Sequence, residues 1–248
     1  MRYALISDIH ANLPALDAVL ADVATRGAAE TYHLGDLVGY SSSPNEVVER
    51  IRAARIGGVA GNYDSTVALA HKHCGCRSEN ARQEELAHIS FEWTLAHTSD
   101  ASKTVLGALP FRLDLKPLGG HVAGPTVTLV HATPTSSLVY VTEDRSDGFL
   151  TKMAGSAGLK AGDVICFGHT HKPWHRTVGG VHFVNTGSVG RPKDGDARAG
   201  YVVLDVDAVN VRVEFVRVGY DIAATIAGVL AAGLPKEFAR FLEAGGTS

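Results

Sequence analysis

The stretch Thr31-Tyr32-His33-Leu34-Gly35-Asp36-Leu37 decides how this chain folds. Its first four residues are typical of a short buried strand, and Gly35 ends that strand by allowing a sharp backbone turn. Asp36 then lies at the carboxyl tip of the strand, where open α/β sheets bind their ligands. Its two carboxylate oxygens can contact two cations at once. By itself, the Gly-Asp pair also fits a turn aspartate that caps the next segment.

Three successive β-α units are predicted in the first part of the chain. Their strands cover residues 2–7, 31–34 and 56–60. Polar side chains follow the strand tips: Asp8, His10, Asp36 and Asn62. Because consecutive β-α units form a parallel sheet whose strand tips share one edge, we expect these side chains to converge.

The remainder of the chain is predicted to complete a single domain, 1–248, since no repeat or linker interrupts the pattern. A helical insertion is expected at about residues 64–98 and a helical extension at about 220–244. Further strands are expected at 111–116, 122–123, 127–131 and 163–167, with a helix at 147–157. Runs at 176–178, 182–185, 201–205 and 209–218 are interpreted as one antiparallel meander.

The composition is ordinary for a globular protein. Of the 248 residues, 45% are hydrophobic and 20% charged, and the formal net charge is -3, which gives no sign of a nucleic-acid or acidic membrane surface. Three cysteines, Cys74, Cys76 and Cys166, cannot all pair, so a reducing, cytoplasmic setting is expected. The apolar stretch 222–234 is too short to cross a bilayer. It could pack on its own domain or on a second copy of the chain, so a homo-oligomer is one possibility.

Histidines at the ends of later strands extend the polar set. His131 ends the strand at 127–131, and His169-x-His171 follows the strand at 163–167. Carboxylate, amide oxygen and imidazole ligands together suit divalent Mn, Fe, Ni or Zn. With 12 histidines, a His-x-His pair is weak evidence alone, so the position of every candidate at a strand end carries the prediction.

Taken together, these short motifs resemble the calcineurin-like metallophosphoesterases, with a likeness to the small bacterial phosphodiesterase branch. The resemblance covers about residues 1–200 and implies an α/β fold, a four-layer αββα sandwich of two mixed β-sheets. It implies a binuclear metal-dependent phosphodiesterase that hydrolyses small phosphoesters or phosphoproteins by in-line attack of a metal-bridging hydroxide. The motifs are Asp8-x-His10, Gly35-Asp36, Gly61-Asn62-x-Asp64, His131 and Gly168-His169-x-His171.

The same resemblance implies how the two divalent metal ions are held. One ion takes Asp8, His10, Asp36 and His171, and the other takes Asp36, Asn62, His131 and His169. Only two carboxylates are present, so a two-metal centre keeps positive charge that attracts an anionic phosphoester. Asp64 is a candidate acceptor for the second nitrogen of one histidine. Asp36, Asn62, Tyr63 and Asp64 are thus expected in the catalytic centre.

Tyr63 departs from the family pattern, which has histidine at this position as the donor of a proton to the leaving group. A phenol with a pKa near ~10 is a poor donor at neutral pH. We therefore expect a preference for phosphodiesters with good leaving groups, and faster turnover of alkyl monoesters after Tyr63→His. The alternative is that Tyr63 packs beside the site. Asn62, Tyr63 and Arg191 are candidate substrate contacts, although Arg191 also fits a solvated loop.

Several histidines and cysteines have more than one interpretation. The segment 71–76, with His71, His73, Cys74 and Cys76, fits a loop over the mouth of the site, an accessory metal or redox site, or a source of the missing proton. His33 is expected in the core or beside a ligand. His175 and His182 are expected to be structural.

Two other function classes stay open. One is a phosphomonoesterase, including a protein Ser/Thr phosphatase, against which Tyr63 argues. The other is a scaffold that kept the fold and lost the chemistry, although all seven expected ligand positions are filled.

Overall fold

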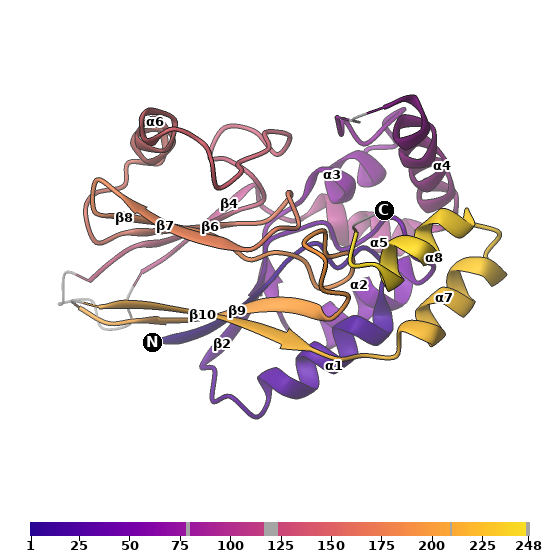
Figure 1. Ribbon diagram of the computed structural model, residues 1–248, viewed down its shortest axis with the longest axis horizontal. Coiled ribbons are helices and arrows are strands. Elements are labelled where there is room, and N and C mark those ends of the chain that lie inside the picture. Colours follow the sequence, from indigo (N-terminus) through magenta and orange to yellow (C-terminus); the bar gives the residue numbers. More distant parts are fainter. Residues whose placement is uncertain (78–79, 117–123, 209, 247–248) are drawn as a thin grey trace.

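Two five-stranded β-sheets face each other in the computed structural model, which describes residues 1–77, 80–116, 124–208 and 210–246 (Figure 1). The first sheet comprises β1 (Arg2–Ile6), β2 (Glu30–His33), β3 (Gly57–Gly58), β9 (Ala199–Val206) and β10 (Val211–Val218), in the order β10-β9-β1-β2-β3. The second comprises β4 (Arg112–Leu115), β5 (Val127–Val130), β6 (Val164–Phe167), β7 (Trp174–Val178) and β8 (Val181–Asn185), in the order β4-β5-β6-β8-β7.

Both sheets are mixed, as expected. The parallel pairs β1–β2 and β2–β3 come from the predicted β-α units, and β5, β6 and β8 are also parallel. The strands β9, β10, β4 and β7 pair antiparallel with their neighbours. The predicted single meander is wrong. The hairpin β7–β8 belongs to the second sheet and the hairpin β9–β10 to the first, because residues 186–198 cross between the sheets. A strand pattern does not specify the sheet in which the strand pairs.

Alternation along the central strands creates three apolar layers. Tyr3 and Leu5 of β1 point between the sheets, where they pack with Cys166 of β6, while Ala4 and Ile6 point to the outer face. There they pack against the helices α1 (Leu13–Val23) and α2 (Pro44–Ala53).

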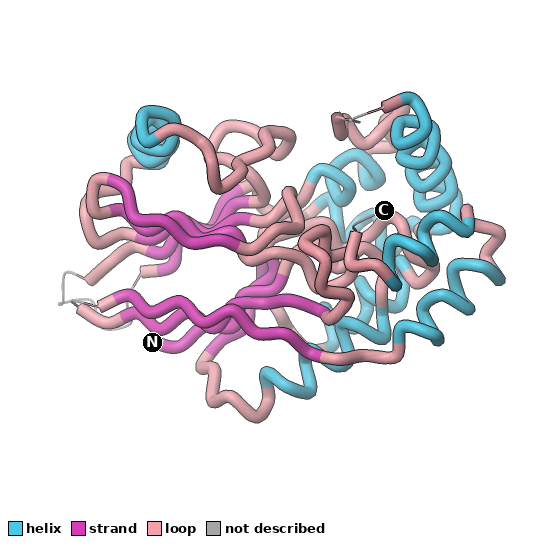
Figure 2. The backbone as a smooth tube through the Cα atoms, in the orientation of Figure 1, coloured by secondary structure: helices cyan, strands magenta, loops and turns pink. Residues whose placement is uncertain are grey.

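Beyond the second sheet, α6 (Asp147–Ala157) packs through Leu150 and Met153 against Phe167 and Phe183. The resulting order, helices, sheet, sheet, helix, is the expected four-layer αββα sandwich, and Figure 2 shows the two sheets stacked with helices outside them.

The remaining helices gather at the carboxyl ends of β1 and β2. They are α3 (Asn62–Ala68), α4 (Ala81–His97), α5 (Asp100–Gly107), α7 (Ile222–Ala231) and α8 (Lys236–Glu243). The sequence pattern does not predict α5, and the expected strand at 56–60 is reduced to the two residues of β3. The strand expected at 122–123 lies outside the described residues. Among the described helices, none combines the length and the apolar character needed to cross a bilayer.

Candidate metal centre

Loops that leave the tips of β1, β2 and β6 form the floor of the site. The amide of Asp8 donates to Gly35 O (3.0 Å) and that of His10 donates to Asp36 O (3.0 Å), so the first two loops are locked together. Backbone strain accompanies this arrangement, because residues without glycine's freedom rarely adopt positive φ. Positive φ occurs at five candidate ligands: Asp8 (50°), His10 (50°), Asp36 (53°), His169 (64°) and His171 (60°).

A first group that can hold a metal ion consists of Asp8, His10 and His171, all buried. His171 Nε2 lies 3.3 Å from Asp8 Oδ1 and 3.2 Å from His10 Nε2. His10 Nε2 is 3.8 Å from Asp8 Oδ1. Residues separated by more than 160 positions in sequence thus direct their ligand atoms to one point.

A second such group consists of Asp36, His131 and His169, and it is equally buried. His131 Nε2 lies 3.2 Å from His169 Nδ1, 3.5 Å from Asp36 Oδ2 and 3.1 Å from Asn62 Oδ1. Asp36 Oδ2 is also 3.8 Å from His10 Nε2 of the first group. The Asp36 carboxylate therefore lies between the two groups, and the structure brings all seven sequence-predicted ligands together.

Backbone carbonyls orient three of the histidines. The carbonyl contacts of Nδ1 are Val38 O for His10 (3.1 Å), Leu34 O for His131 (2.8 Å) and Arg191 O for His171 (2.6 Å). Since a carbonyl only accepts, Nδ1 carries a proton in each ring, so that Nε2 presents a lone pair to the site whenever the ring is neutral. Two such lone pairs, on His10 and His171, face each other at 3.2 Å. A cation between them satisfies both.

An unpaired carboxylate oxygen fits the same occupant. Asp8 Oδ2 accepts from Ser7 Oγ (2.6 Å) and from the His169 amide (3.0 Å). By contrast, Asp8 Oδ1 is buried without a hydrogen-bond partner among the described residues. Buried polar atoms are normally paired. An open carboxylate oxygen beside imidazole lone pairs is the donor set of a divalent cation, so the residues present fit metal ions.

Burial dominates the protonation of these groups. It lowers the pKa of His10 well below its usual value, that of His171 to about 4 and that of His169 to about 3, so these rings are neutral at pH 7. It raises the pKa of Asp36 well above its usual range. For His131, burial acts to lower the pKa, but the neighbouring carboxylates outweigh it and raise the pKa. A bound cation favours ionised carboxylates and neutral imidazoles.

Two glycines allow the carboxylates to sit against bare backbone. A Cβ at Gly61 would lie 2.1 Å from Asp36 Oδ1, and a Cβ at Gly168 would lie 2.3 Å from Asp8 Oδ2. No side chain fits at either position without moving a candidate ligand. The glycines that precede Asn62 and His169 in the sequence motifs thus have a packing role.

Asn62 is oriented by the segment 71–76. Its Nδ2 donates to Cys74 O (3.2 Å) and to Cys76 Sγ (3.2 Å), which leaves Oδ1 directed at His131. The segment therefore lies over the site, as one of its interpretations expected. The metal-capable groups found among the described residues include none of its histidines or cysteines, so an accessory metal site gains no support.

Asp64 does not orient a histidine, and that expectation is corrected. Its carboxylate accepts from the amides of Leu37 (2.8 Å) and Gly61 (2.9 Å), fixing the loop after β2 to the start of α3. No sequence pattern points to the carbonyls that take its place, because every residue has a carbonyl.

Tyr63 contacts the site through its backbone. Its amide donates to Asp36 Oδ1 (2.9 Å), while its hydroxyl lies 3.2 Å from Ser90 Oγ of α4. The side chain is fully buried in the core, and burial raises the pKa of the phenol well above its usual value. This placement supports the packing alternative, and a catalytic or substrate-contacting hydroxyl stays a prediction. His33 is likewise fully buried, in β2.

Comparison with known proteins gives the family. A calcineurin-like phosphoesterase superfamily domain matches residues 1–209. The chain belongs to the calcineurin-like phosphoesterase superfamily. As a phosphoesterase of this family, it is a metal-dependent phosphoric ester hydrolase whose two His/Asp groups can hold divalent metals.

Relatives of this phosphoesterase span nearly its whole length. An uncharacterised protein of Methanocaldococcus jannaschii is 32% identical, covering 94% of this chain and 93% of its own. The phosphodiesterase YfcE of Escherichia coli is 27% identical, covering 85% of this chain and 91% of its own. A metallophosphoesterase crystal structure from Sphaerobacter thermophilus is 29% identical over 99% of both chains, with a TM-score of 0.77. The expected metallophosphoesterase fold is thereby confirmed.

Proposed function

We propose that this phosphoesterase is a binuclear metal-dependent phosphodiesterase. The observation that carries the proposal is the pair of buried His/Asp groups that share one carboxylate, with Asp36 Oδ2 3.8 Å from His10 Nε2 and 3.5 Å from His131 Nε2. A paired site of this kind suits displacement at phosphorus. The name of the 27% identical relative, a phosphodiesterase, supports the diester as the substrate class.

In this proposal, Asp8, His10, Asp36 and His171 hold one cation, and Asp36, Asn62, His131 and His169 hold the other. Mixed imidazole, carboxylate and amide donors suit Mn, Fe, Ni or Zn. When bound, two such cations supply Lewis acidity, which lowers the pKa of water and stabilises charge on the transferring phosphoryl group.

The chain's own residues prepare this site. Main-chain carbonyls hold three imidazoles in the tautomer that presents Nε2, and Cys74 and Cys76 hold the Asn62 amide so that its oxygen faces inward. Only Asp8 and Asp36 bring negative charge to the proposed ligand set, so the loaded centre attracts an anionic phosphoester.

We also propose that residues 1–248 form one metallophosphoesterase domain, with a helical insertion at about 64–98 and a helical extension at about 220–244. A cytoplasmic location is part of this proposal, supported by the three free cysteines.

The test compares metals and substrates on stripped protein. Bis-p-nitrophenyl phosphate and p-nitrophenyl phosphate are assayed after adding Mn, Fe, Ni or Zn separately. We expect metal-dependent hydrolysis in which the diester is the better substrate. A large excess of monoester hydrolysis would instead indicate a phosphomonoesterase, such as a Ser/Thr phosphatase. Inactivity on both substrates with every metal would indicate a non-catalytic scaffold.

A further inference from the structure

We propose that the substrate carries a second phosphate group, which binds in a basic pocket beside the metal centre. This inference rests on the proposed phosphodiesterase function, because the reacting phosphate would bind at the metal centre and the second phosphate in the pocket. The pocket has a volume of about 300 Å³. Its basic lining residues are Arg77, Lys172, Arg191 and Lys193, and no acidic side chain lines it among the described residues.

The pocket adjoins the candidate metal centre directly. Thr170, in its wall, lies between the ligands His169 and His171 in sequence, and the Tyr140 ring lies with its centroid 4.3 Å from that of His169. Cys76, which also lines the pocket, contacts Asn62 at 3.2 Å. A phosphoester seated on the metal centre therefore extends into this pocket.

The Arg191 guanidinium is buried against two aromatic rings in a position where it can bind an anion. Only 9% of the residue's surface is exposed, and its guanidinium lies 4.0 Å from the ring centroid of Tyr40 and 4.9 Å from that of Phe241. Within the described part of the chain, no carboxylate lies within ion-pair distance of this guanidinium. A buried charge without an acidic partner is costly unless a ligand supplies the opposite charge. Stacking on aromatic faces leaves the in-plane N–H donors for the oxygens of a phosphate.

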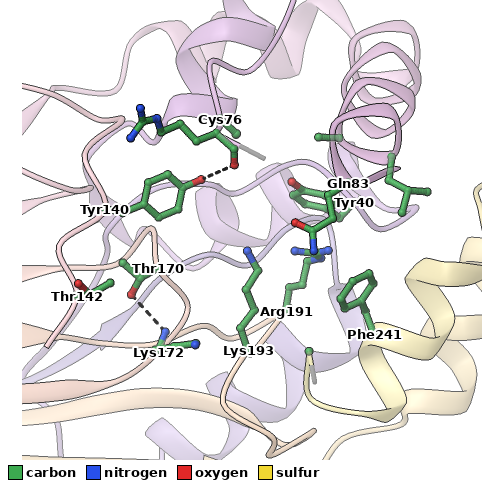
Figure 3. Close-up of a pocket in the computed structure, with 14 residues that line it drawn as sticks. Tyr40, Cys76, Gln83, Tyr140, Thr142, Thr170, Lys172, Arg191, Lys193 and Phe241 are labelled. Carbon is green, nitrogen blue, oxygen red and sulfur yellow. Dashed lines mark hydrogen bonds between the residues drawn. The ribbon is translucent and has the colours of Figure 1, made fainter. Parts of the chain in front are cut away.

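Lysines widen the basic wall on the solvent side. Figure 3 shows Lys193 and Arg191 extending into the space between Tyr140 and Phe241, with Lys172 below Thr170. Lys172 is exposed, and the described residues place no carboxylate within ion-pair distance of it. These cations gather on a chain whose net charge is -3, so they are not part of a generally basic surface.

The charge in the pocket exceeds what one phosphodiester needs. A diester bears a single negative charge, and the metal centre already attracts it. Arg191 and Lys172, for which the described residues supply no carboxylate at ion-pair distance, match a dianionic group, and a phosphate monoester supplies that charge together with oxygens for bidentate contacts with Arg191. A volume of about 300 Å³ lies at the small end of ligand sites, which suits a nucleotide-sized compound.

A matched substrate pair tests the proposal on the full-length, manganese-loaded enzyme. The p-nitrophenyl ester of thymidine 5′-phosphate is compared with the same ester carrying a 3′-phosphate, so the leaving group is constant. We expect kcat/KM to be at least about tenfold higher for the 3′-phosphorylated ester at low ionic strength, mainly through KM, and the advantage to shrink as salt is added.

Charge-removing variants locate the effect. Lys172→Gln and Arg191→Gln are each expected to reduce the ratio of the two kcat/KM values by at least about threefold. Lys152→Gln is the matched control, because Lys152 is exposed on α6 and does not line the pocket. It should leave the ratio unchanged. Far-ultraviolet circular dichroism checks that each variant folds.

Binding of inorganic tripolyphosphate to metal-free protein gives a readout that needs no catalysis. Calorimetry should show binding that weakens at least about tenfold when Lys172→Gln and Arg191→Gln are combined. An active enzyme that hydrolyses both esters equally well overturns the proposal. If neither ester is hydrolysed with any metal, the proposed phosphodiesterase function fails. The tripolyphosphate measurement then tests the basic pocket independently of catalysis. If the wild-type protein does not bind tripolyphosphate, the pocket proposal is overturned.

Discussion

At the residue scale, the shared carboxylate makes Asp36 the most sensitive position of the metal centre. Asp36→Asn retains the shape and the contact with the Tyr63 amide, but removes the charge between the two groups. Since losing an outer hydrogen-bond partner of a metal ligand costs about 10- to 100-fold, we expect losing this ligand to lower kcat for bis-p-nitrophenyl phosphate by more than about 100-fold. Metal analysis should also show fewer ions bound per chain.

The control for this prediction is His175→Ala, because His175 is a half-buried histidine of β7 that pairs with His182 away from the metal centre. It should retain the wild-type rate and metal content. An Asp36→Asn enzyme with two ions and full activity would contradict the shared-carboxylate assignment.

The hydroxyl of Tyr63 provides a second test. Because it bonds to Ser90 Oγ and not to a candidate ligand, we expect Tyr63→Phe to change kcat/KM for the diester by less than about threefold and to lower stability by about 1 kcal/mol. Ser90→Ala should have a similar effect on stability, measured by urea unfolding. A loss of activity beyond about 100-fold in Tyr63→Phe alone would identify the phenol as a proton donor.

His33 gives the metal-free protein a dependence on pH. Burial lowers the pKa of His33 to about 4, and neither ring nitrogen has a hydrogen-bond partner among the described residues. The unfolded chain binds the proton near pH 6.5, whereas the folded chain binds it only near pH 4, so stability falls as the pH drops through this window and is constant above it. The full loss attributable to His33 is about 3 kcal/mol.

Urea unfolding of metal-free wild-type protein and of His33→Leu at pH 7 and pH 4.5 measures this contribution. The wild-type protein should lose about 2 to 3 kcal/mol more than the variant on acidification. Equal losses in both proteins would show that His33 does not titrate in this way.

Residue identity explains what could be predicted about the site. Each of the seven candidate ligands is a side chain at a strand end, and both that position and the residue type are visible in the sequence. The groups that orient them are mostly main-chain carbonyls, such as Leu34 O and Val38 O, whose positions depend on the folded loops. For that reason Asp64, the visible polar neighbour, was the wrong choice of orienting group.

At the element scale, α7 and α8 pack with α4 in a small apolar cluster. Phe238 of α8 is buried with Val229 of α7 and Leu86 of α4, and the Trp93 indole donates to Ala232 O (3.1 Å). Phe238→Ala is expected to cost about 3 to 5 kcal/mol locally. The buried residues of this cluster lie on α4, α7 and α8 or in the turn before α8, and the cluster adjoins the outer sheet core at Tyr40. We therefore expect faster amide exchange across residues 222–243 and little change in β1 and β6.

Phe215→Ala serves as the control, because this phenylalanine of β10 is 41% exposed and its removal leaves no comparable cavity. Hydrogen exchange with mass spectrometry measures both variants. Uniform loss of protection in Phe238→Ala, sheets included, would show that the helical extension folds as one unit with the sandwich.

Elements with strong periodicity were predictable, and short or tertiary ones were not. The helix α6 matches its expected bounds because Ser146 and Gly158 flank it with clear capping chemistry. The two-residue strand β3 is set by pairing with β2, and the allocation of the hairpins β7–β8 and β9–β10 to different sheets depends on contacts far apart in sequence.

At the scale of the whole molecule, the metal centre joins loops from both sheets, so occupancy should stabilise the entire sandwich. A ligand at 100 times its Kd stabilises the folded state by about 2.7 kcal/mol. For a chain of 248 residues this raises Tm by about 5–10 °C per occupied site. Calorimetry of stripped protein with and without manganese measures the shift, which should be smaller in Asp36→Asn. An unchanged Tm in the wild-type protein would contradict a site shared by the two sheets.

The position of the metal centre at one end of β1 determines which end of the chain should carry a purification tag. The metal centre follows the carboxyl end of this strand, whereas Met1 precedes its other end and donates to Val206 O (2.6 Å). Gly246, by contrast, lines the basic pocket. A polyhistidine tag fused after Ser248 would follow Gly246 by only two residues of the chain, so its imidazoles could reach the pocket and the metals being counted. Fusion at the amino end keeps the purification handle on the far side of the sheet.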